Sequence, residues 1–388
     1  MISNIQQQDK QYIANTYARY EVCFSHGAGA LLYDESGKEY IDLGAGIAVN
    51  TFGAADAQWK AAVSAQLDRL QHISNLYYTE PQVLLAELLC TRSGMKRVFF
   101  GNSGAEANEC AIKAARKYAD DKYQGARQTI VTLNHSFHGR TLTTLSATGQ
   151  AQFHQHFHPF TPGFVHAEPG NLAELQTLFD RGDVAALMIE LIQGEGGLNV
   201  LTQDYVQTAA KLAAERDILL IVDEVQTGNG RTGKLYCFEH YGITPDIVST
   251  AKGLAGGLPF GATLLGEKVQ DTLSAGTHGS TFGGNPIAAA GAYNILSRLD
   301  GALLQEVTEK GAFIERTLTG KPGIKSVCGM GLMRGVETEK PAAEILKACL
   351  AKGLVVLTAK NKVRLLPPLN IPMDLLEKGL AILAEACA

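Results

Sequence analysis

The sequence predicts an α/β protein with one large, mostly parallel sheet and a second, smaller α+β domain formed by both ends of the chain. From about residue 95 to 275, short apolar runs without polar alternation are separated by amphipathic helical stretches. This pattern is typical of a parallel sheet covered by helices on both faces. The two ends differ from this central region, and 388 residues are enough for two or three structural units.

The apolar runs of the central region are the predicted strands of the large sheet. They occupy residues 98–100, 128–133, 185–192, 218–222 and 246–250. One helix is expected after the first strand, where alanines recur at helical spacing, and another begins at Thr202 and continues to residue 214. Because ligands bind beyond the carboxyl ends of parallel strands, functional residues are expected just after these runs.

The chain ends predict a different kind of structure. Residues 28–43 predict a β-hairpin with its turn at 34–37. After about residue 280 the chain is mainly helical, with short strands near 335–336 and 363–365. We therefore predict a small domain from both ends and a large domain between them, with the division 1–50, 51–280 and 281–388.

Composition excludes several functions. Acidic residues outnumber basic ones by 39 to 34, which gives a net charge of −5. The chain therefore has no basic excess to bind nucleic acid or a membrane surface. The N-terminus lacks the apolar core of a signal peptide, and no apolar run approaches the ~20 residues of a membrane span. The seven scattered cysteines are typical of reduced core residues, so we expect a cytoplasmic protein.

Two other motifs point elsewhere but lack the right context. The run from Gly228 to Lys234 matches G-x-G-x-x-G and most of a P-loop, yet Leu235 stands where a P-loop needs Ser or Thr. His154, His156 and His158 alternate as zinc ligands on a strand would, but prolines follow and no second cluster supplies a fourth ligand. We expect no nucleotide at the first and a solvated loop, without metal, at the second.

Five segments carry unusual residues just after predicted strands or in glycine-rich turns. Ser103, Gly104 and Ala105 open a helix whose free N–H groups suit a phosphate, although Ser103 with Glu106 is also an ordinary capping box. Phe137 and Arg140, in HSFHGR, either form a packed turn or stack on a flat ring and hold a carboxylate.

The other three segments complete a possible cofactor site. Asp223 leaves a buried strand, where a carboxylate needs a cationic partner. Lys252 ends another strand beside glycines that admit a ligand, as an imine-forming lysine requires. Ser280 and Thr281 form a hydroxyl pair in a glycine frame. A phosphate cradle, a ring platform, an acid and a lysine together indicate pyridoxal phosphate.

The motifs GNSGAEANE, SFHGRT, DEVQTGNGRTG, PDIVSTAKGLAGGLPFGA and GSTFGGNP resemble, in order and spacing, the class III pyridoxal-phosphate aminotransferases. Within that class, GIAVN and HISNLYYTEP resemble the acetylornithine aminotransferase branch. The resemblance covers nearly the whole chain. It implies a fold-type-I transferase with a seven-stranded sheet in its large domain, and a homodimer with active sites at the subunit interface.

The resemblance also implies roles for the cofactor-binding residues. Lys252 would bind the cofactor covalently and then shuttle a proton, while Asp223 would keep the pyridine nitrogen protonated. Phe137 would stack on the ring, and Gln226 would bind the ring hydroxyl. The phosphate would be held by the start of the helix and, from the other subunit, by Thr281. The full cofactor-binding set is Ser103, Gly104, Ala105, Phe137, Asp223, Glu224, Val225, Gln226, Lys252 and Thr281.

Four further residues would bind substrate. Arg140 would hold the distal carboxylate of the donor, assisted by Ser280, and Arg364 would hold the α-carboxylate of glutamate or 2-oxoglutarate. Glu195 would pair with Arg364 while the amine donor is bound and swing away for the acceptor. The resemblance also suggests that Glu190 braces Gln226.

The expected reaction is transfer of the δ-amino group of N2-acetyl-L-ornithine to 2-oxoglutarate, a step of arginine biosynthesis. Other ω-amines stay open as donors: N2-succinylornithine, ornithine, 4-aminobutyrate and N-succinyl-diaminopimelate. A nucleotide-binding protein and a non-catalytic protein of the same fold are the alternatives from other classes. The family usually has L-G-H-x-H-P where this chain has FGAADA at 52–57, which bears on fine specificity. Leu191 stands where proline is common, a change expected to alter little.

Overall fold

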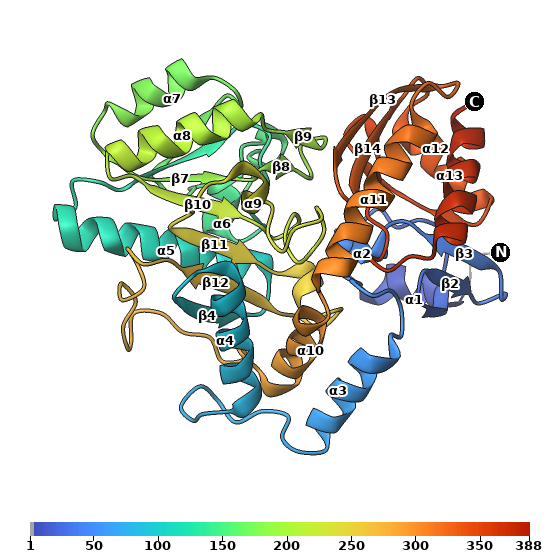
Figure 1. The fold of residues 1–388 in the computed structure, drawn as a ribbon, viewed down its shortest axis with the longest axis horizontal. Helices are drawn as coiled ribbons and strands as arrows, with labels where there is room; N and C mark the ends of the chain where they lie inside the picture. The colour runs from blue at the N-terminus through green and yellow to red at the C-terminus, as the bar shows by residue number, and fades with distance from the viewer. Residues whose placement is uncertain (1–3) are drawn as a thin grey trace.

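The computed structural model describes residues 4–388, and its centre is a seven-stranded sheet (Figure 1). The strand order is β4-β12-β11-β10-β7-β5-β6. Only β12 runs against its neighbours, so the sheet is mostly parallel, as predicted. The strands are β4 (Arg97–Gly101), β5 (Thr129–Leu133), β6 (Phe164–Ala167), β7 (Val184–Ile189), β10 (Leu219–Asp223), β11 (Ile247–Thr250) and β12 (Gly261–Leu265).

Helices cover both faces of this sheet because alternate residues of a strand point in opposite directions. In β10, Leu219 and Ile221 pack in the cluster that contains one side of α5. Leu220 and Val222 face the main core, together with α8. The helices of this region are α3 (Ala57–Leu67), α4 (Glu80–Ser93), α5 (Gly104–Tyr123), α6 (Leu142–Ala147), α7 (Leu172–Phe179), α8 (Gln203–Glu215), α9 (Phe238–Tyr241) and α10 (Pro286–Ser297). Single 3-10 turns lie at Ala151–Phe153 and Lys252–Leu254.

The predicted strands are confirmed with two corrections. The run 185–192 is not one strand, because β7 ends at Ile189 and a separate short hairpin, β8 (Ile192–Gln193) with β9 (Asn199–Val200), follows. Strands β6 and β12 were not predicted. β6 is a short edge strand that is mostly half-buried, and β12 follows a glycine-rich turn that gives no periodic signal. The helix expected to begin at Thr202 is α8, and the Thr202 side chain caps it.

Both chain ends meet in the smaller sheets. The predicted hairpin is confirmed as β2 (Leu31–Asp34) and β3 (Glu39–Asp42), with Gly37 at φ +83° in the turn. β3 pairs in parallel with β15 (Leu354–Val355), so N-terminal and C-terminal segments share one sheet, as Figure 1 shows. The other elements of the two ends are α1 (Asn4–Tyr12), β1 (Phe24–Ala28), α2 (Ala45–Ala48), α11 (Gly301–Leu318), β13 (Ile324–Met330), β14 (Met333–Thr338), α12 (Ala342–Ala351), β16 (Leu357–Ala359), β17 (Lys362–Leu365) and α13 (Met373–Cys387).

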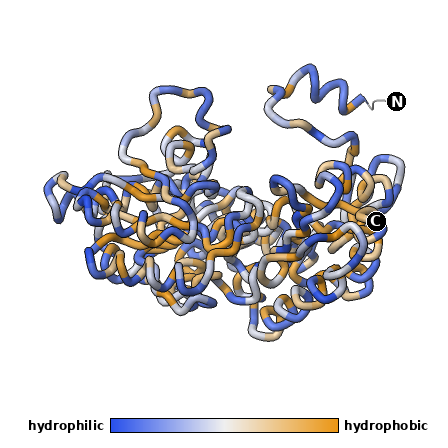
Figure 2. The backbone as a smooth tube through the Cα atoms, turned by 90° about the horizontal axis from the view of Figure 1, so that it is seen from above, coloured by the Kyte–Doolittle hydropathy of each residue, from blue (hydrophilic) through white to orange (hydrophobic). Residues whose placement is uncertain are grey.

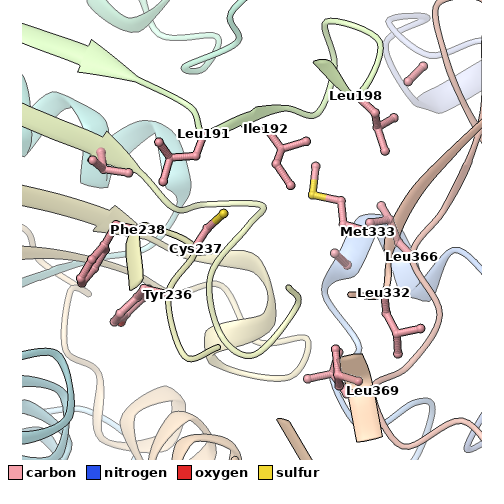
Figure 3. Close-up of a cluster of buried hydrophobic side chains, with 14 of the residues drawn as sticks. Leu191, Ile192, Leu198, Tyr236, Cys237, Phe238, Leu332, Met333, Leu366 and Leu369 are labelled. Carbon is pink, nitrogen blue, oxygen red and sulfur yellow. The ribbon is translucent and has the colours of Figure 1, made fainter. Parts of the chain in front are cut away.

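A continuous apolar core joins the large sheet to the C-terminal region. Figure 3 shows Leu191, Ile192 and Cys237 of the large region facing Met333 and Leu366 of the C-terminal region. This packing holds the loops that follow β7 and β10 against β14 and β17. The residue-level domain division at 50 and 280 stays a prediction.

The structure also places the glycine-rich run at 228–234 and the histidines at 154, 156 and 158. The backbone and guanidinium of Arg231, within the Gly228–Lys234 run, bond to Leu332 and Pro367, so this run is buried against the C-terminal region. His154 lies at the end of a 3-10 turn in an irregular segment rather than on a strand.

Across residues 4–388, a search for a helix both long and apolar enough to span a bilayer finds none. All seven cysteines carry free thiols, and three of them (Cys23, Cys90 and Cys328) are half-buried rather than in the core. Helix α1 has no buried residue and stands off the body of the molecule in Figure 2.

Candidate active site

A cavity of about 420 Å³ lies at the carboxyl ends of the parallel strands. The last residue of β10 and residues that closely follow β4, β7 and β11 line it, in agreement with the expected location. It gathers residues from four of the five predicted segments. The predicted residues among its walls are Ser103, Gly104, Ala105, Phe137, Arg140, Asp223, Val225, Gln226 and Lys252.

The start of α5 forms one end of the cavity. The Ser103 hydroxyl caps the helix by accepting a 3.1 Å hydrogen bond from the Glu106 N–H. The N–H groups of Gly104 and Ala105, in the first turn, have no carbonyl partner within the helix. A side chain at position 104 would come within 2.7 Å of Val225, so glycine is required for this close approach. Capping and an anion site therefore coexist here.

Asp223 lies on the floor of the cavity and is 3% exposed. Its Oδ2 accepts hydrogen bonds of 2.8 Å from His138 Nδ1 and from the Asn108 amide. Its Oδ1 accepts one of 3.0 Å from the Val225 N–H. Burial lowers the pKa of His138, but the hydrogen bond and charge of Asp223 outweigh it, and that pKa is raised. Asp223 therefore favours the protonated form of His138 relative to burial alone.

Lys252 follows β11 and reaches the same cavity. Its backbone is left-handed, with φ +46°, a conformation uncommon for a residue with a side chain. Burial lowers the pKa of the Lys252 amine, and the carboxylates of Glu195 and Asp223 only partly oppose this effect. A lowered pKa increases the neutral, nucleophilic fraction of the amine at a given pH.

Phe137 and Arg140 also line the cavity. The Arg140 guanidinium is exposed and lies 4.2 Å from the ring centre of Phe153 and 5.5 Å from that of Phe137. The Phe137 N–H donates a 2.8 Å hydrogen bond to Glu190 Oε2. The expectation that Glu190 braces Gln226 is therefore wrong: Glu190 holds the backbone of Phe137. Burial raises the pKa of Glu190 to about 7, and His138 opposes that rise.

Beside Gln226, Arg364 and Glu195 form an ion pair. The Arg364 guanidinium is 3% exposed and lies 2.6 Å from Glu195 Oε1. It also donates to Gln226 Oε1 at 3.1 Å and to the Gly194 carbonyl at 3.2 Å. A side chain at Gly194 would overlap the Gln226 amide, so glycine admits this packing. Burial raises the pKa of Glu195, but Arg364 outweighs burial and holds the pKa below its usual range.

Five predicted residues are not among the described residues that line the cavity: the ion pair of Glu195 and Arg364, and Glu224, Ser280 and Thr281. The Glu224 carboxylate is buried on Thr227 and the Phe238 N–H, so its expected place in the cofactor set is not supported by its position. Its burial raises its pKa to about 7. Ser280 accepts a 3.1 Å hydrogen bond from the Asn102 amide. Thr281 is exposed at the surface, outside its own chain's cavity.

The sequence did not single out His138 and Asn108 as site residues. Both contact Asp223, from positions 85 and 115 residues away in the chain. His138 stands in the HSFHGR segment that also carries Phe137 and Arg140, and this position was the signal that could have marked it as a site residue. Asn108 follows the first turn of a helix and resembles any polar helical residue.

The residues present fit pyridoxal phosphate. The cavity presents the Lys252 amine, whose pKa burial lowers, an aromatic ring on Phe137 and a helix N-terminus for a phosphate. Asp223 supplies a buried carboxylate whose hydrogen bonds from His138 and Asn108 fix its orientation. A cationic aromatic nitrogen is the partner that a buried carboxylate requires.

Comparisons with known proteins agree with this chemistry. The family model described as "Aminotransferase class-III" matches residues 12–387. Acetylornithine aminotransferases of Haemophilus ducreyi and Caldanaerobacter subterraneus are similar to the chain. The first is 51% identical and the match covers 98% of each chain; the second is 43% identical with 97% of each covered.

Two solved structures have the same fold. The ornithine aminotransferase of Toxoplasma gondii superposes with a TM-score of 0.94 at 33% identity, covering 99% of this chain and 94% of that one. The N-acetylornithine aminotransferase of Stenotrophomonas maltophilia superposes with a TM-score of 0.85 at 35% identity, covering 98% and 97%. The residues of the cavity and the full-length matches lead to the same conclusion. The chain belongs to the class III aminotransferases, which use pyridoxal phosphate.

Proposed function

We propose that the protein transfers the δ-amino group of N2-acetyl-L-ornithine to 2-oxoglutarate, giving N-acetyl-L-glutamate 5-semialdehyde and L-glutamate in arginine biosynthesis. The observation that carries this proposal is the ion pair between Glu195 and Arg364 beside the lysine cavity. The names of the relatives from Haemophilus ducreyi and Caldanaerobacter subterraneus support the choice of donor.

The residues of the cavity divide the work of an amino transfer. Bound pyridoxal phosphate supplies an electron sink for the substrate carbon that loses its proton. Lys252 would move that proton with its side-chain amine, whose pKa is lowered by burial. Asp223 would hold a proton on the ring nitrogen, and Phe137 would stack on the ring. The N–H groups of Gly104 and Ala105 bind the phosphate.

The ion pair explains how one site accepts two substrates. The donor reacts through a terminal amine and needs no cation at Arg364, because Glu195 already neutralises that guanidinium. The acceptor brings a carboxylate to the same place, so Glu195 must move away to expose Arg364. Arg140, which is exposed and also lines the cavity, holds the distal carboxylate of either substrate.

The test is to follow the absorbance of the purified protein through both half-reactions. Acetylornithine should bleach the yellow colour and 2-oxoglutarate should restore it. A yellow protein that ignores acetylornithine but responds to another ω-amine would contradict the proposed donor. A protein that stays colourless with added pyridoxal phosphate would contradict the cofactor assignment.

Free ornithine is the second candidate donor. The structural match to the ornithine aminotransferase of Toxoplasma gondii, with a TM-score of 0.94, favours it. Ornithine carries a charged α-amine where acetylornithine carries a neutral amide, so the two differ at the acyl end. The kcat/KM for each, measured beside N2-succinylornithine, 4-aminobutyrate and N-succinyl-diaminopimelate, ranks all five donors.

The proposed functional unit is a homodimer, located in the cytoplasm. The exposed position of Thr281, outside its own cavity, supports a role for its hydroxyl on the phosphate of the other subunit. Large side chains near it are also exposed: Leu76 is 86% exposed, Tyr78 99% and Phe282 60%. Such clustered apolar surface is typical of an interaction site. Sedimentation velocity tests the dimer, and a monomer fully active at its working concentration would contradict it.

A further inference from the structure

Asn75 joins two surface loops that are far apart in the chain. Its side-chain amide donates one hydrogen bond of 3.0 Å to the Ser280 carbonyl and another of 2.8 Å to the Gly283 carbonyl. One amide thus spans both ends of the turn that carries Thr281.

The orientation of the Asn75 amide is fixed by a second side chain. Its Oδ1 accepts a 2.8 Å hydrogen bond from Gln82 Nε2, so the nitrogen must face the turn. Gln82 itself packs on Gly284, where any side chain would overlap it. Both amide hydrogens of Asn75 therefore bond to the 280–283 turn, and its amide oxygen accepts the bond from Gln82.

The Ser280 side chain makes a hydrogen bond within the turn and another to Asn102, which precedes α5 in the same chain. The Ser280 hydroxyl accepts a 2.9 Å hydrogen bond from the Gly283 N–H and one of 3.1 Å from the Asn102 amide. The neighbouring side chain, Thr281, is exposed and does not line the cavity of its own chain. These bonds fix the backbone on both sides of Thr281 while leaving its hydroxyl free to meet another molecule.

We propose that Asn75 is a positioning residue: it holds the 280–283 turn so that Thr281 reaches the phosphate bound by a second copy of this chain. The inference rests on the proposed function, which places Thr281 in the other subunit's site. It adds a role for the HISNLYYTEP segment, which the proposed chemistry leaves unused. It also predicts that Asn75 acts only through Thr281 and does not hold the dimer together.

The experiment measures how fast the holoenzyme releases pyridoxal phosphate, followed by the loss of its absorbance during dilution. T281A and N75A should each release the cofactor about tenfold faster, because affinity changes within one interface are expressed mainly in dissociation. A tenfold change equals ~1.4 kcal/mol, the size expected for one hydrogen bond. The double variant N75A/T281A should release it no faster than T281A alone, because the two residues act in series.

The control is N361A, which removes another exposed asparagine whose amide bonds only at 3.4 Å to Glu337. It should release the cofactor at the wild-type rate. N75A should sediment as wild type does. If T281A releases the cofactor faster and N75A does not, the role of Asn75 is wrong and the proposed function stands.

Two other results would contradict the proposal. Additive effects in the double variant, or an N75A chain that sediments as a smaller species than wild type, would assign Asn75 to general structure or assembly. If T281A releases the cofactor at the wild-type rate, Thr281 does not reach the phosphate, and both the inference and that part of the proposed function fail.

Discussion

His138 Nδ1 donates a 2.8 Å hydrogen bond to Asp223 Oδ2, and both side chains are almost completely buried. His138 lies in the segment between β5 and α6 and Asp223 ends β10, so the fold alone brings them together. The pKa of His138 is raised: burial lowers it, but Asp223 opposes burial and prevails. The hydrogen bond from His138 fixes the orientation of the Asp223 carboxyl group at the cavity.

Removing this imidazole should weaken catalysis without removing the cofactor. A hydrogen bond to a charged group contributes ~1.5–3 kcal/mol, so H138A should lower kcat by about 10- to 100-fold. H156A, which truncates an exposed histidine, should leave kcat unchanged. Steady-state kinetics on fully loaded enzyme gives the answer, and a wild-type kcat for H138A would show that Asp223 needs no such partner.

The Glu195–Arg364 pair predicts opposite effects for its two members. R364A should raise KM for 2-oxoglutarate by about 10- to 100-fold, since a charge-assisted hydrogen bond is lost, and should affect the acetylornithine half-reaction less. E195A should favour glutamate over acetylornithine as donor, because Arg364 is then always exposed. Single-turnover rates at varied concentrations of 2-oxoglutarate, acetylornithine and glutamate measure the change in KM for the acceptor and the change in donor preference.

The control for this pair is R181A, which removes an exposed arginine paired with Asp183. It should change neither half-reaction. Equal losses with both substrates in R364A would indicate that Arg364 supports the fold of the site rather than selecting a carboxylate.

The site was largely predictable because its key residues are chemically unusual where they stand. Asp223 and Lys252 end apolar strands, and a charged group in such a position needs a functional or electrostatic reason. Arg364 and Glu195 came only from the family resemblance, since an arginine in a short strand gives no local signal. The resemblance also implied their pairing, and the structure contains that ion pair.

The parts that were not predictable depend on contacts between distant segments. Glu190 faces Phe137 rather than Gln226 because the backbone of the 135–140 loop passes over it. Glu224 follows Asp223 directly, so its side chain points to the opposite side, toward Thr227. The fold class was clear from apolar runs, whereas β6 and β12 are short and lack a distinctive pattern.

Glu224 predicts a pH dependence of stability that is separate from catalysis. Burial raises its pKa from 4.5 to about 7, so the folded state binds more protons than the unfolded state between these values. Stability should therefore fall as pH rises from about 4.5 through the folded pKa of about 7, by about 3 kcal/mol for this group, and level off above it. Glutamine at this position is neutral throughout, so Tm of wild type relative to E224Q should fall between pH 5 and pH 8.

The matched control for that measurement is E344Q, which changes an exposed glutamate. The Tm difference between wild type and E344Q should be nearly constant over the same range. A Tm difference for E224Q that is equally flat would show that Glu224 ionises normally in the folded protein.

Lys252 gives the most stringent prediction, because its amine serves both attachment and proton transfer. K252A should abolish turnover and covalent retention of the cofactor after borohydride reduction, which mass spectrometry detects. K211A, which removes an exposed lysine, should retain both. The buried environment that lowers the pKa of Lys252 is made by the cavity itself, so K252R should not restore activity: guanidinium stays protonated. Turnover by K252A at an ordinary rate would contradict the assignment of the reactive amine and, with it, the division of roles among the other residues of the cavity.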